Sequence, residues 1–351
     1  MEHILHKTLI IRFSSVGDVV LSSLLVRTLR RRFPDSQIDF LVKAEYAELV
    51  RHSPYVSRVI EFPRGGTLRD LLHLRRTLHA VGYDLIVDIH DSLRSRLICF
   101  GGGTHVRIRK RKIARSILVA FKRDVYRFFG GAPSVAHRYL ETVLVYGVVD
   151  DGKGLDVFLP VGASTKTDVL FRNAGITRRK LVIGLCPSAR HATKIWPAER
   201  YADLAINLVR QRRAAILLLG AREDLERCAQ IEEGIRSALP ESQVLNLAGV
   251  LTLSETAAGM DRCSLVISND SGLMHLAVAR KRKVLAIFGS TVKQFGFFPF
   301  GTLSEVAEHP GLPCRPCSHI GLPECPKGHF KCMQEIGVGD ILASAQRFLA
   351  A

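Results

Sequence analysis

Hydrophobic and polar positions alternate in blocks along the whole of this 351-residue chain. The first block, residues 8–13, is mostly apolar and predicts a buried strand. A polar turn follows at 14–18, and the apolar residues of 19–33 then recur at helical spacing. A second strand is predicted at 37–42, and it completes a β-α-β unit, the building block of parallel sheets. The turn lacks the G-x-G-x-x-G pattern, which argues against a dinucleotide site.

The same alternation continues to the end of the chain. Further strands are predicted at residues 56–62, 83–88, 181–187, 215–219, 244–247, 265–267 and 284–288, with helices between them at 68–81, 198–212 and 253–260. A stretch at 147–180 that contains proline and several glycines separates two such series. We therefore predict an α/β protein with an N-terminal domain over 1–160, a C-terminal domain over 175–335 and a final helix within 336–351.

The stretch 265–291 contains the strongest candidate for a ligand site. Its predicted strand ends in a polar turn, which leads into a short apolar helix. Helix amino termini at the carboxyl ends of strands offer unpaired amide N–H groups, and these favour phosphate. The pattern places Asp270, Ser271, Gly272 and His275 at such a junction, as candidate ligand contacts. Most strand-turn-helix junctions bind nothing, however, so the residues by themselves leave an ordinary packed turn as the alternative.

Two polar turns in the N-terminal half follow predicted strands in the same way. Asp18 lies just inside the first predicted helix, where an acid commonly compensates the helix dipole. The functional alternative for Asp18 is a general base. Arg94 and Arg96 follow the strand at 83–88 and provide cationic side chains at its tip.

The charge of the chain is strongly unbalanced, with 50 Lys and Arg against 33 Asp and Glu and a net charge of +17. This excess indicates an anionic partner: nucleic acid, a phosphorylated metabolite or an anionic membrane surface. Nine basic residues interleave with apolar ones in the segment 107–127, which predicts a basic amphipathic helix suited to a membrane surface. Aromatic residues make up only 7% of the chain, which weakens the nucleic-acid interpretation because stacking on bases needs exposed rings.

The chain shows no secretory signal and no apolar run near the roughly 18 residues of a membrane span. We therefore expect a cytoplasmic protein with reduced cysteines. Four of these, Cys314, Cys317, Cys325 and Cys332, have a spacing suited to a structural four-thiolate zinc site. The alternative is a metal-free loop.

Four separated segments resemble glycosyltransferase family 9, the heptosyltransferases of lipopolysaccharide core assembly. They are residues 12–20, 88–95, 194–197 and 268–275. The resemblance implies a GT-B fold, in which two Rossmann-like domains face each other across a cleft and hold the acceptor and the activated sugar. It also implies inverting transfer from ADP-L-glycero-D-manno-heptose to a lipopolysaccharide inner-core acceptor, with no cofactor required for catalysis. A C-terminal helix that packs back on the N-terminal domain is a further implication.

The resemblance assigns a role to each motif residue. Asp18 would be the catalytic base, and Lys194 would neutralise the charge of the departing diphosphate. The implied donor-binding residues are Ser188, Thr193, Lys194, Glu226, Asp270, Ser271, Gly272 and His275, with Glu223 as a less favoured substitute for Glu226. The implied acceptor-binding residues are Ser15, Gly17, Arg94 and Arg96. An acid beside phosphates is unexpected, so Asp270 can instead orient its loop or a sugar hydroxyl.

The segment 107–127 would then meet the inner membrane, where a lipid-linked phosphorylated or acidic glycan serves as acceptor. Three alternatives stay open at this point. One is a family member that uses another nucleotide sugar for a cell-surface glycan. Another is a non-enzymatic polyanion binder, supported only by charge, although no nucleic-acid partner is expected. The third is a dehydrogenase, which the missing G-x-G-x-x-G disfavours.

Overall fold

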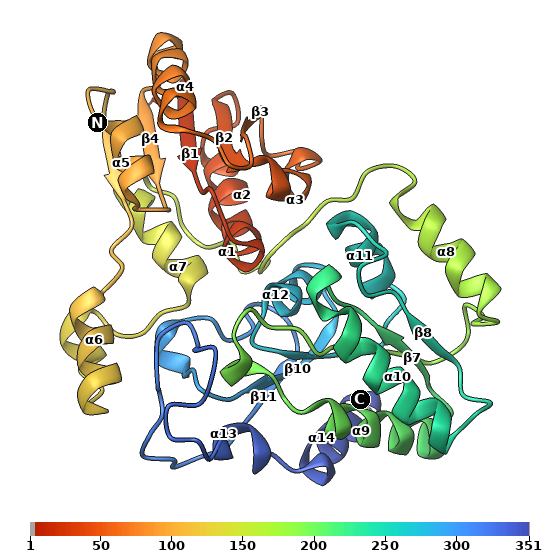
Figure 1. The fold of residues 1–351 in the computed structure, drawn as a ribbon. Coiled ribbons are helices and arrows are strands. Elements are labelled where there is room, and N and C mark those ends of the chain that lie inside the picture. Colours follow the sequence, from red (N-terminus) through yellow and green to blue (C-terminus); the bar gives the residue numbers. More distant parts are fainter. Residues whose placement is uncertain (1–3, 351) are drawn as a thin grey trace. The chain divides into compact units, whose positions relative to one another are not determined.

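The computed structural model describes residues 4–350, which form two compact units (Figure 1). The first unit contains the chain up to Lys110 together with Pro133–Phe158. The second contains Arg111–Ala132 and the chain from Leu159 onward. Residues 111–132, which the sequence analysis included in the N-terminal domain, therefore belong to the second unit.

The first unit is built on a five-stranded sheet in the order β3-β2-β1-β4-β5, with every neighbouring pair parallel. The strands are β1 (Lys7–Ile11), β2 (Gln37–Lys43), β3 (Arg58–Phe62), β4 (Leu85–Asp88) and β5 (His105–Arg107). The helices are α1 (Val16–Leu21), α2 (Ser23–Arg32), α3 (Glu48–Arg51), α4 (Leu68–Val81), α5 (Leu93–Cys99) and α7 (Val135–Leu140), with 3-10 turns η1 (Ala44–Tyr46) and η3 (Glu141–Tyr146). β1 and β4 are almost wholly buried, as expected where helices cover both faces of a parallel sheet.

The strand order of this sheet reverses between β1 and β4. The chain first adds β2 and β3 on one side of β1 and then returns to add β4 and β5 on the other. Ligands of open α/β sheets bind outside the carboxyl ends of the strands at such a switch point. The segments that leave β1 and β4 at this point are 12–18 and 89–96, which contain the two N-terminal motifs.

The single helix predicted over 19–33 is two helices in the structure. α1 ends at Leu21 and α2 begins at Ser23. Ser22 lies between them, and its hydroxyl donates to the carbonyl of Val19 at 2.6 Å. Serine side chains compete in this way for backbone groups, which weakens helix continuity although the apolar spacing runs through the break.

The second unit is built on a six-stranded parallel sheet in the order β11-β10-β9-β6-β7-β8. The strands are β6 (Val182–Cys186), β7 (Ala215–Leu218), β8 (Val244–Asn246), β9 (Leu265–Asn269), β10 (Lys283–Phe288) and β11 (Ser304–Glu308). The helices are α6 (Lys112–Phe121), α8 (Ala163–Asn173), α9 (Ala198–Arg212), α10 (Leu225–Ala238), α11 (Leu253–Met260), α12 (Gly272–Ala279), α13 (Lys331–Gln334) and α14 (Val338–Ala350), with 3-10 turns η2 (Tyr126–Phe129), η4 (Ala192–Lys194), η5 (Arg222–Asp224) and η6 (Lys293–Phe295). The switch point here lies between β6 and β9.

The C-terminal helix α14 packs on its own unit. It contacts α9 and β10, and the Lys283 ammonium donates to the carbonyl of Phe348 at 2.8 Å. Ile341, Ala345 and Phe348 join the core that contains the fully buried Trp196. The packing of this helix on the N-terminal domain, which the family resemblance implied, stays a prediction.

The segment Arg111–Ala132 is joined to the second unit by a small apolar cluster. Ala114, Leu118 and Tyr126 bury their side chains against Phe295. The Lys122 ammonium also donates to the carbonyl of Pro316 at 2.7 Å. These contacts explain why a segment from the N-terminal half of the sequence belongs to the second unit.

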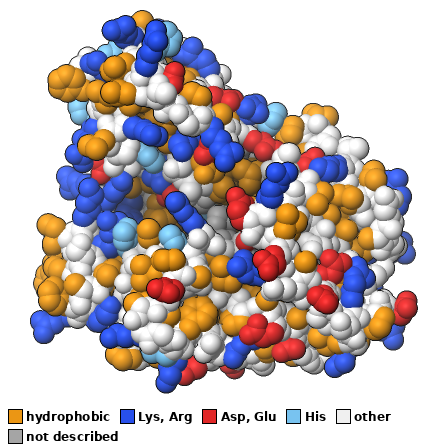
Figure 2. All heavy atoms as spheres, viewed as in Figure 1, with side chains coloured by type: hydrophobic (Ala, Val, Ile, Leu, Met, Phe, Trp, Pro, Cys, Tyr) orange, Lys and Arg blue, Asp and Glu red, His pale blue; other side chains and the backbone are white. Residues whose placement is uncertain are grey.

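Of the basic amphipathic helix predicted over 107–127, only α6, Lys112–Phe121, is α-helical, and it is partly covered. Ile113, Phe121 and Phe128 of this segment expose 63%, 71% and 70% of their surface. Figure 2 shows hydrophobic and basic side chains next to one another over α6. Within residues 4–350, no helix has the length and apolar character that crossing a membrane would require.

Candidate functional site

The first-unit site is centred on Asp18, in the first turn of α1. Ser15 precedes the helix, and both its amide and its hydroxyl donate to Asp18 Oδ2, at 3.3 and 3.2 Å. Asp18 therefore serves the helix start, as its position in the sequence indicated. Ser15 is exposed and Gly17 is buried in the same turn.

Two further side chains hold the Asp18 carboxylate. Arg12 Nη2 lies 2.6 Å from Oδ2, and the Tyr139 hydroxyl donates to Oδ1 at 3.0 Å. Burial by itself would raise the pKa of Asp18, but the Arg12 charge and the hydrogen bonds from Tyr139 and Ser15 hold that pKa below its usual value. Asp18 is therefore an ionised carboxylate at neutral pH, which is the form that can accept a proton.

The tip of β4 lies beside β1, and a buried carboxylate organises it. Asp88 accepts hydrogen bonds from the amides of His90 and Asp91 at 3.1 and 2.8 Å, and its side chain is paired with Arg107 at 3.0 Å. Burial, with the charges of Arg12 and Lys110, lowers the pKa of His90 to about 4. His90 is thus a neutral ring beside two cationic groups.

The predicted acceptor-binding arginines lie on α5, immediately after this tip. Arg94 is exposed. Arg96 is paired with Asp91 at 2.7 Å. Because α1 and α5 both follow strands that flank the switch point, the structure brings Asp18 and these arginines to the same edge of the sheet.

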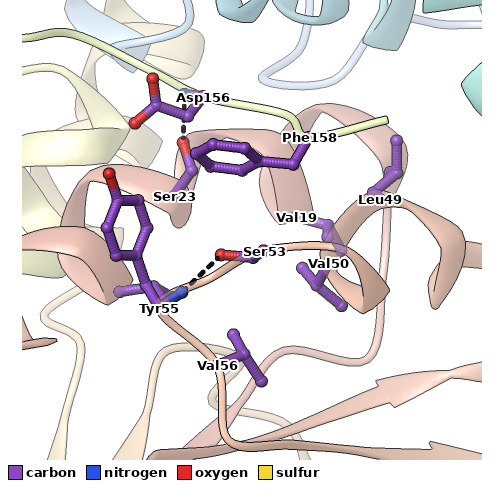
Figure 3. A pocket seen from close by; sticks show the side chains of 10 residues that line it. Val19, Ser23, Leu49, Val50, Ser53, Tyr55, Val56, Asp156 and Phe158 are labelled. Atoms are coloured by element: carbon purple, nitrogen blue, oxygen red, sulfur yellow. Dashed lines mark hydrogen bonds between the residues drawn. The ribbon is translucent and has the colours of Figure 1, made fainter. Parts of the chain in front are cut away.

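A small apolar pocket lies beside α1 in the same unit (Figure 3). It is lined by residues that include Val19, Leu49, Tyr55 and Phe158, and the Ser23 hydroxyl at its wall accepts the amide of Asp156 at 2.9 Å. Its free volume of about 10 Å³ has room for about one water molecule. A sugar therefore does not fit in it.

The second-unit site is centred on an ion pair between Lys194 and Asp270. Lys194 ends η4 in the loop after β6, and Asp270 directly follows β9. Their side chains meet at 2.7 Å, and Thr291 donates to the same Asp270 oxygen at 2.7 Å. The loop with η4 follows β6, and Asp270 follows β9. These two strands are neighbours at the switch point, which explains why motifs far apart in sequence meet here.

The start of α12 adjoins this ion pair. Ser271 is its N-cap and Gly272 is its first residue, so their amides belong to the unpaired first turn of an eight-residue helix. His275 is buried one turn later, with its ring centroid 6.3 Å from that of Phe297. Asp270, Ser271, Gly272 and His275 thus lie together as the sequence analysis expected.

The other predicted donor residues lie in the loops after β6 and β7, and two of them are engaged in structural hydrogen bonds. Ser188 donates to the buried Asp224 at 2.7 Å. Thr193 accepts the amide of Leu322 at 2.8 Å. Glu226, in the first turn of α10, is exposed, as is Glu223.

The four cysteines of the predicted zinc site lie in the second unit. Within residues 4–350, no group of three or more His, Cys, Asp or Glu side chains is placed to hold a metal ion. Cys332 is buried in the core cluster with Trp196, while Cys314, Cys317 and Cys325 are partly exposed. The structural zinc site therefore stays a prediction.

Sequence reasoning missed Tyr139, Asp224 and Thr291 as neighbours of the site residues. Arg12 was inside a recognised motif but received no role. Tyr139 lies 121 positions from Asp18, and no local pattern distinguishes it from other helix tyrosines.

Comparisons with known proteins agree on one family. A model of glycosyltransferase family 9 (heptosyltransferase) matches residues 71–326. Lipooligosaccharide heptosyltransferase 2 of Haemophilus influenzae is 31% identical over 304 residues, which cover 82% of this chain and 84% of that protein.

Two solved structures share the fold over nearly the full length. The glycosyl transferase family 9 protein of Veillonella parvula has a TM-score of 0.82 at 19% identity and covers 100% of this chain and 99% of its own. The E. coli ADP-heptose LPS heptosyltransferase II has a TM-score of 0.72 at 22% identity, with 98% of each chain covered. The predicted fold class, a GT-B protein with two Rossmann-like domains, is confirmed.

Proposed function

Since the chain belongs to glycosyltransferase family 9, we propose that it transfers a heptose from ADP-heptose to a lipopolysaccharide inner-core acceptor. The named relatives support this donor and acceptor, because one acts as a lipooligosaccharide heptosyltransferase and another as an ADP-heptose LPS heptosyltransferase. The observation that carries the proposal is that each of the two switch points holds a group that glycosyl transfer needs. One sheet presents an ionised carboxylate, and the other presents a cation beside a helix amino terminus.

The proposed reaction is a single displacement. The acceptor hydroxyl gives its proton to Asp18 while its oxygen forms a bond to the anomeric carbon. The bond between that carbon and the diphosphate oxygen breaks, and ADP leaves with the electron pair. Attack from the face opposite the leaving group inverts the anomeric configuration.

We assign the stabilisation of the departing diphosphate to the second-unit site. The Lys194 ammonium would neutralise its charge, and the amides of Ser271 and Gly272 would donate to its oxygens. Asp270 then has a positioning role, because its carboxylate holds the ammonium at 2.7 Å. An ammonium has three donors, so Lys194 can keep its bond to Asp270 and still donate to phosphate.

We further propose that the segment Arg111–Ala132 lies on the anionic surface of the inner membrane, where a lipid-linked acceptor is found. Phe121 and Phe128 are exposed, and the Arg127 guanidinium lies 4.6 Å from the Phe128 ring centroid. Aromatic rings between basic side chains suit the boundary between headgroups and acyl chains.

The membrane proposal is tested by flotation with vesicles that contain phosphatidylglycerol. We expect binding that weakens with salt and with a double variant, Phe121→Ser with Phe128→Ser. Leu303→Ser, which removes an exposed leucine elsewhere in the second unit, is the matched control and should bind normally. Equal binding of the double variant and the control would contradict the assignment of this surface.

The reaction is tested by incubating the protein with ADP-heptose and lipopolysaccharide truncated before its heptoses. We expect release of ADP and an acceptor heavier by one heptose, with both products formed about 10²-fold or more slowly in Asp18→Asn. The same assay with UDP-sugars and GDP-sugars tests the donor. Turnover with one of these and not with ADP-heptose would overturn the named sugar while leaving the reaction type intact.

A further inference from the structure

The two oxygens of the Asp18 carboxylate have different surroundings. Oδ2 faces three donors: Arg12 Nη2 at 2.6 Å, the Ser15 hydroxyl at 3.2 Å and the Ser15 amide at 3.3 Å. Oδ1 accepts one hydrogen bond, from the Tyr139 hydroxyl at 3.0 Å. A carboxylate oxygen has two lone pairs. Oδ2 is therefore saturated, whereas Oδ1 retains a lone pair for another donor.

We propose that Oδ1 of Asp18 is the atom that receives the acceptor proton, and that Tyr139 is the positioning residue that directs its remaining lone pair at the acceptor hydroxyl. This inference rests on the proposed function, because it refines the role given to Asp18 there. Arg12 contributes by holding Oδ2, so that rotation of the carboxylate is blocked from both sides.

The fold makes Tyr139 a rigid hydrogen-bond donor. Its side chain is fully buried on α7, and that helix packs against both α1 and α2. The Arg12 guanidinium lies 5.6 Å from the Tyr139 ring centroid, where the two groups attract each other. Both groups also contact the Asp18 carboxylate. Arg12 is held in turn by the carbonyl of Ile89, to which Nη1 donates at 2.7 Å.

Tyr139 keeps its own proton throughout the reaction. Burial, reinforced by the nearby negative charge of Asp18, holds the pKa of Tyr139 well above its usual value, although the Arg12 charge opposes this. The phenol therefore donates a hydrogen bond and does not act as the base. The acceptor proton moves to Oδ1, the new bond to the anomeric carbon forms, and the diphosphate leaves with its electron pair.

The first test is Tyr139→Phe, which keeps the ring and removes the hydroxyl. We expect kcat to fall roughly 10- to 100-fold, a part of the ~10²–10⁴-fold that a general base supplies. The KM for the donor should stay within about twofold, because no donor-site residue is altered. The acid limb of the kcat/KM profile should move to higher pH, because the lost hydrogen bond favoured the ionised form of Asp18.

Tyr55→Phe is the matched control in the same unit. The Tyr55 ring packs edge-to-face on Phe158, with centroids 5.5 Å apart, and we expect this variant to keep the kcat and pH profile of the unsubstituted protein. A second form of the test replaces Tyr139 with difluorotyrosine, which keeps the hydroxyl and makes it a stronger donor. The acid limb should then move to lower pH, opposite to the shift in Tyr139→Phe.

A double-mutant cycle separates this inference from the proposed function. In the Asp18→Asn background, Tyr139→Phe should lower the residual rate no further, because the base is already absent. Loss of activity in Asp18→Asn together with normal kcat and pH dependence in Tyr139→Phe would overturn the role of Tyr139 and spare the base. Full activity in Asp18→Asn would overturn both assignments of Asp18, and no turnover by the unsubstituted protein with any nucleotide sugar would overturn the proposed function itself.

Discussion

Replacing Lys194 by alanine is the most direct test of the second-unit site. The Lys194 and Asp270 side chains are 15% and 7% exposed and meet at 2.7 Å, so solvent screens this pair little. The change removes the only cation that the proposal places at the departing diphosphate. It also leaves the Asp270 carboxylate next to the bound phosphates, with the Thr291 hydroxyl as its only donor among residues 4–350.

The expected magnitude follows from these contacts. A hydrogen bond to a charged group contributes about 1.5–3 kcal/mol, which corresponds to roughly 10- to 150-fold in the Kd for ADP. Repulsion between the diphosphate and the unpaired Asp270 acts in the same direction. We therefore treat about tenfold as a lower bound for Lys194→Ala.

The assay is calorimetric titration with ADP at fixed ionic strength. Lys166→Ala is the matched control, because it removes the same charge from the same unit where Lys166 is paired with Glu255 at 3.1 Å. We expect the control to keep its Kd within about twofold. The double variant Lys194→Ala with Asp270→Asn should bind ADP more tightly than Lys194→Ala, because the uncompensated carboxylate is gone. Unchanged affinity in Lys194→Ala, or no recovery in the double variant, would refute the reasoning.

Three further predictions concern the first unit and the α6 segment. Asp18→Asn should lower turnover by about 10²-fold or more while the Kd for ADP, measured by titration, stays within about twofold; a large loss of ADP binding would argue against a role confined to proton transfer. Arg27 is buried and bonded to Asp151 and Asp156, so Arg27→Met should lower the free energy of unfolding by about 3 kcal/mol in urea titrations near neutral pH. The Arg27 hydrogen bonds lower the folded-state pKa of Asp151, so this stabilisation is present above the unfolded-state pKa of about 4. The difference in unfolding free energy between the unsubstituted protein and Arg27→Met should therefore narrow below that pH. A difference independent of pH would contradict this account. Leu118→Ala should lower the free energy of local unfolding of the α6 segment by about 2–4 kcal/mol and speed amide hydrogen exchange across Lys112–Phe121. Unchanged exchange would show that the apolar cluster does not hold the segment.

The central strands and the polar turns after them could be predicted from the sequence because each is encoded locally. β1, β4, β6 and β9 are runs of apolar residues long enough to be recognised, and the side chains that follow them share a sheet edge once the strands are parallel. Two of the four edge strands, β5 and β11, were missed for the converse reason, whereas the edge strands β3 and β8 were predicted. β5 and β11 are partly exposed and carry no continuous apolar run.

The partners of the site residues could not be predicted because they come from distant parts of the chain. Tyr139 reaches Asp18 only through the packing of α7 on α1, and Thr291 reaches Asp270 only because β10 lies beside β9.

The packing of Arg111–Ala132 on the second unit limits how this protein can be recombined with its relatives. The chain passes between the units after Lys110, after Ala132 and after Phe158. In a chimaera joined only at Phe158, α6 would come from one protein and Phe295 from the other. Mismatched side chains in the apolar cluster that these elements share would then act like core substitutions. Exchange of the first unit between family members is therefore expected to need three junctions, with residues 111–132 inherited together with the second unit.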